Sequence, residues 1–190
     1  DGLDEYQKFG VAFLATAKRA VLADDIGLGK TAQAVRAVYE VGARRVLYVT
    51  RKSLICNTQQ QIALWSPAGA SPVEWTVTNY EQVVKNAAGL KRERFDVVIA
   101  DEAHYAKNRK AKRTKALAAV TKDCPYVYVL TGRPVLNAPD ELWSLLHIIR
   151  PKEFRSYWAF VEEYCTTEYN PWSGWQQVTG LKAGAEALLA

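Results

Sequence analysis

Short apolar segments alternate with stretches of helical periodicity along almost the whole chain. Residues 46–49, 95–100 and 126–130 are nearly continuous apolar runs, which predict strands buried on both faces. Between such runs, as in residues 31–41, apolar positions recur every three or four residues and predict helices. This alternation predicts an α/β fold in which helices cover both faces of a parallel sheet.

Capping residues indicate where further helices begin. Ser53 is expected to cap a helix that ends near residue 65, and Asn79 to cap the next helix. Residues 107–122 and 140–150 are also predicted to be helical. The polar motifs described below then follow the carboxyl ends of strands, which is where parallel sheets bind ligands.

Length and composition are those of one globular domain, with 190 residues, 49% hydrophobic and 24% charged. No apolar run of about 18 residues occurs, so no membrane span is predicted, and the first residues do not resemble a signal peptide. Three cysteines without a CxxC pair favour an intracellular setting over a zinc site or a disulfide framework. Because the sequence begins with Asp1 and contains no Met, we expect a piece of a longer protein.

The composition changes after Pro151, where aromatic side chains become frequent. We therefore divide the sequence into an α/β lobe, residues 1–151, and an aromatic-rich helical extension, residues 152–190. Residues 170–174 are expected to form a turn within the extension.

A basic segment spans residues 107–115 and contains no acid. It is either a solvated helix face or a surface for an anionic partner, and its place directly after an acidic motif favours the second interpretation. The chain as a whole carries a net charge of +5. The basic residues of the segment are Lys107, Arg109, Lys110, Lys112, Arg113 and Lys115.

A glycine-rich segment, residues 25–31, lies between a predicted strand and a helix. Its glycines allow backbone N–H groups to close around phosphate oxygens, and the helix N-terminus favours negative charge. Lys30 is expected to reach the β- and γ-phosphates of ATP, and the Thr31 hydroxyl to ligate Mg²⁺. The general pattern has a glycine where this chain has Asp24, so the segment alone is also compatible with a structural turn.

Two adjacent carboxylates follow the strand predicted at residues 95–100. Asp101 is expected to hold Mg²⁺ through water, and Glu102 to polarise the water that attacks the γ-phosphate. An acidic helix start would give the same local pattern, and residues 131–137 after the next strand are by themselves compatible with a tight turn. Their joint occurrence at strand ends indicates a nucleotide site.

Four motifs, in order and over almost the entire chain, resemble those of the Swi/Snf-type family of ATP-dependent DNA translocases in helicase superfamily two. They are DDIGLGKT from residue 24, TNYEQV from residue 78, DEAHYAKN from residue 101 and LTGRPVLNAPDELWSLL from residue 130. In the extension, FVEEYC and NPWSGW resemble the HARP-type annealing helicases. The resemblance implies a RecA-like P-loop lobe that uses ATP and Mg²⁺. Its implied partners are double-stranded or forked DNA and a second RecA-like lobe of the full-length protein, without a membrane or an obligate oligomer.

The resemblance also implies roles for individual residues. The implied catalytic residues are Lys30, Asp101 and Glu102, with Thr31 and Asp101 as metal ligands. The implied ATP-binding residues are Gln7, which would contact the adenine, and Asp25, Gly27, Leu28, Gly29, Lys30 and Thr31. The residues implied to couple hydrolysis to DNA engagement are His104, Thr131, Gly132 and Arg133. The implied DNA contacts are Arg51, Lys52, Ser53, Thr78, Asn79, Tyr80, Lys107 and Asn108, with core packing as the alternative for Tyr80.

Two residues depart from the family pattern. Arg51 stands where a proline is usual, so it is expected either to add a phosphate contact or to loosen the turn. Arg133 replaces the usual threonine, which puts the coupling geometry in question. Because no arginine-finger motif occurs up to Ala190, we expect residues 1–190 alone to bind nucleotide weakly and to hydrolyse it negligibly.

Two other functions stay open at this point. DEAH also occurs in RNA helicases, although GLGKT, TNYEQV and DELWSLL speak against that class. A non-catalytic module in which ATP only switches DNA affinity is the second alternative, and such a module has no need of Glu102.

Overall fold

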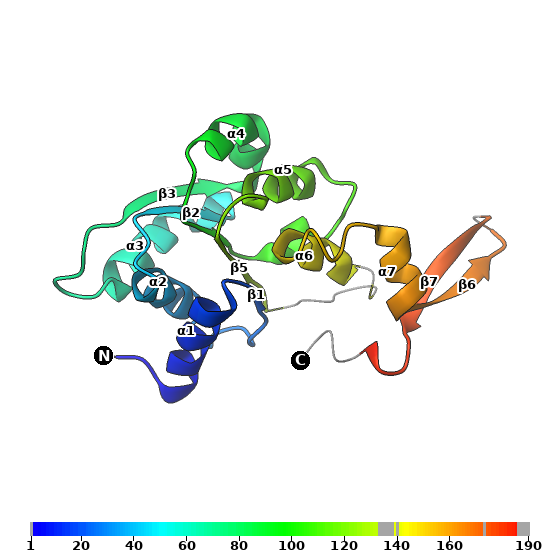
Figure 1. Ribbon diagram of the computed structural model, residues 1–190, viewed down its shortest axis with the longest axis horizontal. Helices are drawn as coiled ribbons and strands as arrows, with labels where there is room; N and C mark the ends of the chain where they lie inside the picture. Colours follow the sequence, from blue (N-terminus) through cyan, green and yellow to red (C-terminus); the bar gives the residue numbers. More distant parts are fainter. Residues whose placement is uncertain (1, 133–138, 140, 173, 186–190) are drawn as a thin grey trace.

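The computed structural model describes residues 2–132, 139, 141–172 and 174–185 (Figure 1). The helices are α1 (Glu5–Ala17), α2 (Lys30–Glu40), α3 (Ile55–Trp65), α4 (Tyr80–Arg92), α5 (Lys112–Thr121), α6 (Glu141–Ile149) and α7 (Tyr157–Tyr164), with 3₁₀ turns η1 (Lys52–Leu54) and η2 (Ala103–Ala106). The strands are β1 (Arg19–Leu22), β2 (Arg45–Thr50), β3 (Glu74–Asn79), β4 (Val97–Ala100), β5 (Tyr126–Leu130), β6 (Cys165–Asn170) and β7 (Trp175–Leu181).

Strands β1 to β5 form one sheet in the order β1-β5-β4-β2-β3, and every pairing is parallel. Helices α1, α2 and α3 cover one face, and α4, α5 and α6 cover the other (Figure 1). The predicted α/β fold with helices on both faces is therefore confirmed. All five carboxyl ends lie along one edge of the sheet, as parallel strands require.

Strands β1, β2, β4 and β5 contribute alternate residues to two separate apolar cores. Leu47 and Val49 of β2 pack with Leu117 of α5 in the core under α4 to α6. Val46 of β2 packs with Val35 of α2 in the core under α1 to α3. Because both faces of these strands are covered, their sequences lack the apolar–polar alternation of a one-sided sheet, whereas the edge strand β3 keeps it and packs only on the core under α1 to α3.

At the amino edge of the sheet, Arg19 of β1 binds the C-terminal ends of α5 and α6. Its guanidinium donates hydrogen bonds to four backbone carbonyls. Two of these carbonyls belong to the last two residues of α6. The other two belong to the last residue of α5 and to the turn that follows it. The acceptors are the carbonyls of Ile148 (2.7 Å), Ile149 (2.7 Å), Thr121 (3.0 Å) and Cys124 (2.5 Å). A cation at helix C-termini satisfies carbonyls that have no partner within their helix.

Several predicted boundaries need correction. Ser53 does not cap α3, because the backbone N–H of Leu54 bonds the Arg51 carbonyl and a 3₁₀ turn precedes the helix. The predicted helix at 107–122 begins only at Lys112, because the Asn108 side chain accepts the Lys110 N–H and competes with helix formation. By contrast, Asn79 caps α4 as predicted, with its Oδ1 3.0 Å from the Gln82 nitrogen.

The extension is only partly helical. After α7, strands β6 and β7 form an antiparallel hairpin that extends away from the sheet (Figure 1). The prediction of a helical extension over residues 152–190 was therefore wrong for residues 165–181, where β-branched and aromatic residues favour strands. The turn expected near residues 170–174 connects β6 to β7, and Gly174 has a φ of 71°. Residues 186–190 lie outside the described part of the chain.

Within the described residues, no helix combines the length and the apolar character needed to cross a membrane.

Candidate ATP and magnesium site

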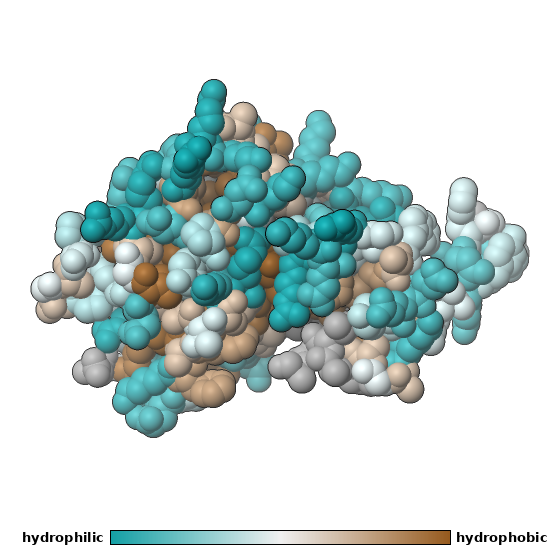
Figure 2. Space-filling model, in the orientation of Figure 1, coloured by the Kyte–Doolittle hydropathy of each residue, from teal (hydrophilic) through white to brown (hydrophobic). Residues whose placement is uncertain are grey.

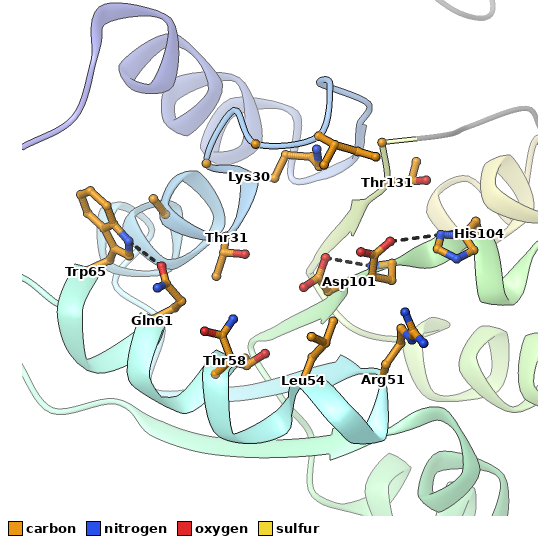
Figure 3. Close-up of a pocket in the computed structure, with 17 residues that line it drawn as sticks. Lys30, Thr31, Arg51, Leu54, Thr58, Gln61, Trp65, Asp101, His104 and Thr131 are labelled. Carbon is orange, nitrogen blue, oxygen red and sulfur yellow. Dashed lines mark hydrogen bonds and ion pairs between the residues drawn. The ribbon is translucent and has the colours of Figure 1, made fainter.

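A cavity of about 600 Å³ opens at the carboxyl edge of the sheet, where the predicted catalytic motifs converge (Figure 3). The loop before α2, the end of β4 and the end of β5 contribute to its wall, and η1 and α3 close it on the far side. It is lined by Ile26, Gly27, Gly29, Lys30, Thr31, Ala32, Arg51, Leu54, Asn57, Thr58, Gln61, Trp65, Asp101, Glu102, His104, Thr131 and Gly132.

The glycine-rich loop leads directly into helix α2. Gly29 has a φ of 71°, and a Cβ at that position would lie 2.4 Å from Nε2 of Gln7, so both conformation and space require glycine. The Lys30 ammonium bonds the carbonyl oxygens of Asp24 (2.7 Å) and Asp25 (2.8 Å). In a nucleotide complex, phosphate oxygens would accept the hydrogen bonds that these two carbonyl oxygens accept from Lys30 here.

The side chain of Gln33 hydrogen-bonds the glycine-rich loop, a role that the sequence did not indicate. Its side chain is fully buried, and Nε2 donates to the Asp24 carboxylate (2.9 Å) and to the Leu28 carbonyl (3.1 Å). Gln7 donates to the same Leu28 carbonyl at 3.4 Å. Gln7, predicted to contact the adenine, is thus placed beside the loop, and its side chain is buried in this structure.

Two buried tyrosines hold Asp101 at the end of β4. The hydroxyl of Tyr48 donates to Oδ2 of Asp101 at 3.1 Å, and the hydroxyl of Tyr80 donates to its backbone carbonyl at 2.6 Å. Burial raises the pKa of the Asp101 carboxyl, while hydrogen bonds from the Glu102 N–H and from Tyr48 oppose that shift. Burial also raises the pKa of both tyrosines well above its usual value, so their hydroxyls remain donors at neutral pH.

The Thr31 hydroxyl and the Asp101 carboxylate face each other across the cavity (Figure 3). Thr31 also acts to lower the pKa of the Tyr48 hydroxyl that bonds Asp101, so Tyr48 lies close to both side chains. A hydroxyl and a carboxylate are oxygen donors of the kind that Mg²⁺ prefers, and the metal usually keeps several waters beside one or two such ligands. No group of three or more His, Cys, Asp or Glu side chains in the described ranges could hold a metal ion by itself. The residues present therefore fit a magnesium ion that is bound together with phosphate.

The side chains of Glu102 and His104 contact each other at the cavity rim. Nδ1 of His104 lies 3.1 Å from Oε2 of Glu102 (Figure 3). Glu102 has a φ of 50° and a ψ of 44°, a left-handed conformation that is uncommon outside glycine. Non-glycine residues held in this way cluster at functional sites.

The end of β5 closes the cavity beside the glycine-rich loop. Thr131 is buried, and its backbone N–H bonds the Leu22 carbonyl of β1 at 3.1 Å. Gly132 lies against Ile26 of the loop. Arg133, predicted to couple hydrolysis to DNA engagement, lies outside the described residues.

Residues 57–177 match the SNF2-related domain family. The chain belongs to this family. The SNF2-related domain is 32% identical over 199 residues to the bovine SWI/SNF-related matrix-associated actin-dependent regulator of chromatin subfamily A-like protein 1, a match that covers 97% of the chain and 21% of that relative. It is 31% identical over 183 residues to the bovine DNA annealing helicase and endonuclease ZRANB3, and this match covers 84% of the chain and 17% of that protein. The chain thus spans only about a fifth of these curated relatives.

A solved structure shares the fold of this SNF2-related domain. The Sulfolobus solfataricus SWI2/SNF2 ATPase core, solved in complex with dsDNA, superposes with a TM-score of 0.75. The match covers 86% of this chain and 39% of that one, at 23% sequence identity. Its fold agrees with the RecA-like lobe predicted from the sequence.

Helix α3 supplies a wall of the cavity that the sequence did not single out. Thr58, Gln61 and Trp65 face the cavity from successive turns (Figure 3). The Trp65 indole N–H donates to Oε1 of Gln61 at 3.0 Å, which fixes the ring at the rim. These residues are three and four positions apart, which predicts that they share one helix face. The same spacing is found in a helix that packs on a core, so it could not identify a cavity wall.

A second concave surface lies on the other side of η1 in the SNF2-related domain. Several predicted DNA contacts meet there, together with Lys85 of α4 and Tyr105 of η2. Arg51 lines both this surface and the ATP cavity, so it lies between the two. The full lining consists of Arg51, Lys52, Ser53, Asn79, Tyr80, Glu81, Gln82, Lys85 and Tyr105.

Three predicted DNA contacts have side chains that are engaged within the protein. Tyr80 is 1% exposed and bonds the backbone of Asp101, so the alternative interpretation of core packing describes it correctly. The Lys107 ammonium lies 2.8 Å from Oε2 of Glu141, and its side chain is only 12% exposed. Asn79, in turn, uses its side-chain oxygen to cap α4.

Proposed function

We propose that this chain is the ATP-binding lobe of an ATP-dependent translocase that moves along double-stranded DNA. The observation that carries the proposal is the convergence of Lys30, Thr31, Asp101 and Glu102 on one cavity of a SNF2-related domain. These four residues supply the phosphate grip, the metal ligands and the carboxylate that hydrolysis requires.

Each side chain has a separate task in the proposed reaction. Lys30 exchanges its two carbonyl partners for phosphate oxygens, and Thr31 and Asp101 would hold Mg²⁺, which would supply positive charge beside the phosphates. Glu102 orients the attacking water by accepting a hydrogen bond from it. Because His104 pairs with Glu102 at the rim, it restricts the directions that the carboxylate can take.

The proposed partner is double-stranded or forked DNA. Arg51, Lys52 and Ser53 at the start of η1 remain the proposed backbone contacts, with Thr78 at the end of β3 and Asn108 after η2. Phosphate contacts of this kind do not depend on base sequence, so binding is expected to weaken steeply with salt. The SWI2/SNF2 core of similar fold was solved with dsDNA, and a relative described as a DNA annealing helicase supports an annealing role.

A second RecA-like lobe in the full-length protein completes the proposal. We infer that this lobe supplies the arginine finger, so residues 1–190 alone bind ATP weakly and hydrolyse it negligibly. Because the proposed partner is DNA, we also propose an intracellular location, and we propose no obligate oligomer.

The decisive experiment measures ATP hydrolysis by the full-length protein with duplex DNA, with RNA and without nucleic acid. We expect duplex DNA to stimulate hydrolysis and RNA not to. Glu102→Gln should lower kcat by a factor of 100 or more, in the range of about 10² to 10³ for lost transition-state stabilisation, while ATP binding persists. Lys91→Gln, in an exposed pair with Asp123 at the amino edge of the sheet, is the matched control and should hydrolyse ATP like the parent protein.

Each alternative gives a different result. Stimulation by RNA rather than DNA would identify an RNA helicase. Unchanged hydrolysis in Glu102→Gln would remove the catalytic assignment, and ATP-dependent DNA affinity without hydrolysis would identify a nucleotide-switched binding module.

A further inference from the structure

Tyr80 fixes the peptide bond between Asp101 and Glu102. Its hydroxyl donates to the carbonyl of that peptide at 2.6 Å, and the N–H of the same peptide, from Glu102, donates to Oδ1 of Asp101 at 2.8 Å. Both polar groups of the peptide are therefore held by side chains. The direction in which the Glu102 side chain leaves the backbone depends on this plane.

Glu102 needs such an anchor because its left-handed backbone is intrinsically unfavourable. With a φ of 50°, the conformation persists only where surrounding contacts impose it. Tyr80 suits that purpose, because it is the first residue of a capped helix, 1% exposed and packed in the core under α4 to α6. Its ring cannot turn away without disturbing that core.

The ring of Tyr80 is stacked on Tyr105, which reaches the surface with the predicted DNA contacts. The two ring centroids lie 6.0 Å apart with planes 20° from parallel. On Tyr105 lie two guanidinium groups, that of Arg51 at 5.4 Å and that of Arg113 at 5.3 Å from the ring centroid. One cation follows β2 and the other belongs to the basic segment, so two cationic segments meet on a single ring.

The surroundings of this ring favour an anion. Figure 2 shows hydrophilic side chains over α4 and α5, and Lys85 of α4 lines the same concave surface as Tyr105 and Arg51. A phosphate oxygen is a stronger partner for a guanidinium than an aromatic face is. Binding of a DNA backbone would therefore change the contacts that Arg51 and Arg113 make with Tyr105.

We propose that Tyr80 is a positioning residue for Glu102, and that Tyr105 transmits engagement of DNA phosphates by Arg51 and Arg113 to Tyr80. The proposal rests on the proposed function, because it takes DNA as the anion. The DNA-free and DNA-bound states differ in the contacts to Tyr105, which is the differential interaction that coupling between two sites requires. The path is short: Arg51 or Arg113, Tyr105, Tyr80, and then the Asp101 carbonyl.

The first test compares Tyr80→Phe with Tyr128→Phe in the full-length protein. Tyr128 is equally buried, on β5 of the same sheet, and its hydroxyl has no hydrogen-bond partner among the described residues. Tyr80→Phe should lower kcat about tenfold, the loss expected for one buried hydrogen bond that orients the catalytic carboxylate, with little change in KM for ATP. Tyr128→Phe should leave kcat within about twofold of the parent protein. Equal effects of the two substitutions on kcat, or a change confined to melting temperature, would overturn the positioning role.

The second test uses Tyr105→Leu and measures the ratio of DNA-stimulated to DNA-free turnover. That ratio should fall about tenfold, while the Kd for a fluorescent DNA duplex changes less than about threefold, because the two arginines remain. Retention of the ratio, or its loss only in proportion to DNA binding, would overturn transmission through Tyr105. If duplex DNA does not stimulate the parent protein, the proposed function and the transmission both fail. The comparison of Tyr80→Phe with Tyr128→Phe in DNA-free turnover still decides the positioning role.

Discussion

At the scale of single residues, the chain uses buried and half-buried polar side chains to hold backbone groups in place. Gln33 binds the loop that carries Lys30, Tyr80 binds the Asp101 carbonyl, and Arg19 binds helix ends. Buried polar groups are costly unless they are satisfied, so each of these contacts fixes local geometry strongly.

Arg19 gives a prediction about stability at this scale. Arg19→Met keeps the apolar stem but leaves four carbonyls without their charged donor, so we expect the free energy of unfolding of residues 1–190 to fall by about 3 kcal/mol. Urea unfolding followed by circular dichroism measures the change. Arg150→Met, which removes only an exposed pair with Glu153, should cost at most about 0.5 kcal/mol. Similar losses for both variants would refute the role given to Arg19.

At the scale of elements, helices α1 and α2 approach closely at Gly10. A Cβ on Gly10 would lie 1.7 Å from Oε1 of Gln33, which is fully buried and so has no space to move. The contact therefore links the first helix to the glycine-rich loop through one side chain.

Gly10→Ala should displace Gln33 and act on both stability and nucleotide binding. We expect a loss of about 2 kcal/mol in the free energy of unfolding, as is typical of overpacking, together with a weaker affinity for ATP. The double variant Gly10→Ala/Gln33→Ala should recover most of the stability but not the affinity, since the loop still lacks its support. Unfolding and nucleotide titration of the four proteins of this cycle separate the two effects. Additive losses of stability would show that Gly10 and Gln33 act independently.

The sequence predicted those parts of the site whose signal is local. Lys30, Thr31, Asp101 and Glu102 lie in short motifs whose spacing carries their chemistry, and the sheet follows from unbroken apolar runs. Tyr48 could not be assigned, because its partner Asp101 is 53 positions away and a tyrosine within an apolar run looks like core. Gln33 could not be assigned, because a glutamine within a helix carries no local sign that it is buried and directed at the preceding loop. The hairpin was not predicted, because Tyr169, Trp172 and Trp175 recur every three residues, a spacing that suits a helix and lacks the alternation of a strand.

At the scale of the whole molecule, the exposure of the three cysteine side chains shows how completely the core excludes solvent. Cys56 is exposed on α3, whereas Cys124 and Cys165 are buried. Burial raises the pKa of the Cys124 thiol to about 11, so little thiolate is present at pH 8.

We therefore predict that one thiol per chain reacts rapidly with a disulfide reagent under native conditions, and that all three react in denaturant. Cys56→Ser should abolish the rapid phase, and absorbance of the released thiol measures the count. Rapid reaction of two or more thiols in the native protein would contradict the closed core. Because the Cys124 thiol stays largely protonated up to about pH 11, its reaction in the native protein should remain slow at pH 8 and at pH 9.

The strand order has a consequence for how the protein becomes able to bind nucleotide. Among the described strands, β1, which precedes the glycine-rich loop, pairs with β5 alone, and the contact of Arg19 with Thr121 spans 102 positions. Strand β1 must therefore wait for β5, and such non-local pairing is slow to form. If nucleotide binds as proposed, it stabilises chains in which β1 has paired with β5, and ATP affinity becomes a readout of finished folding rather than of early collapse.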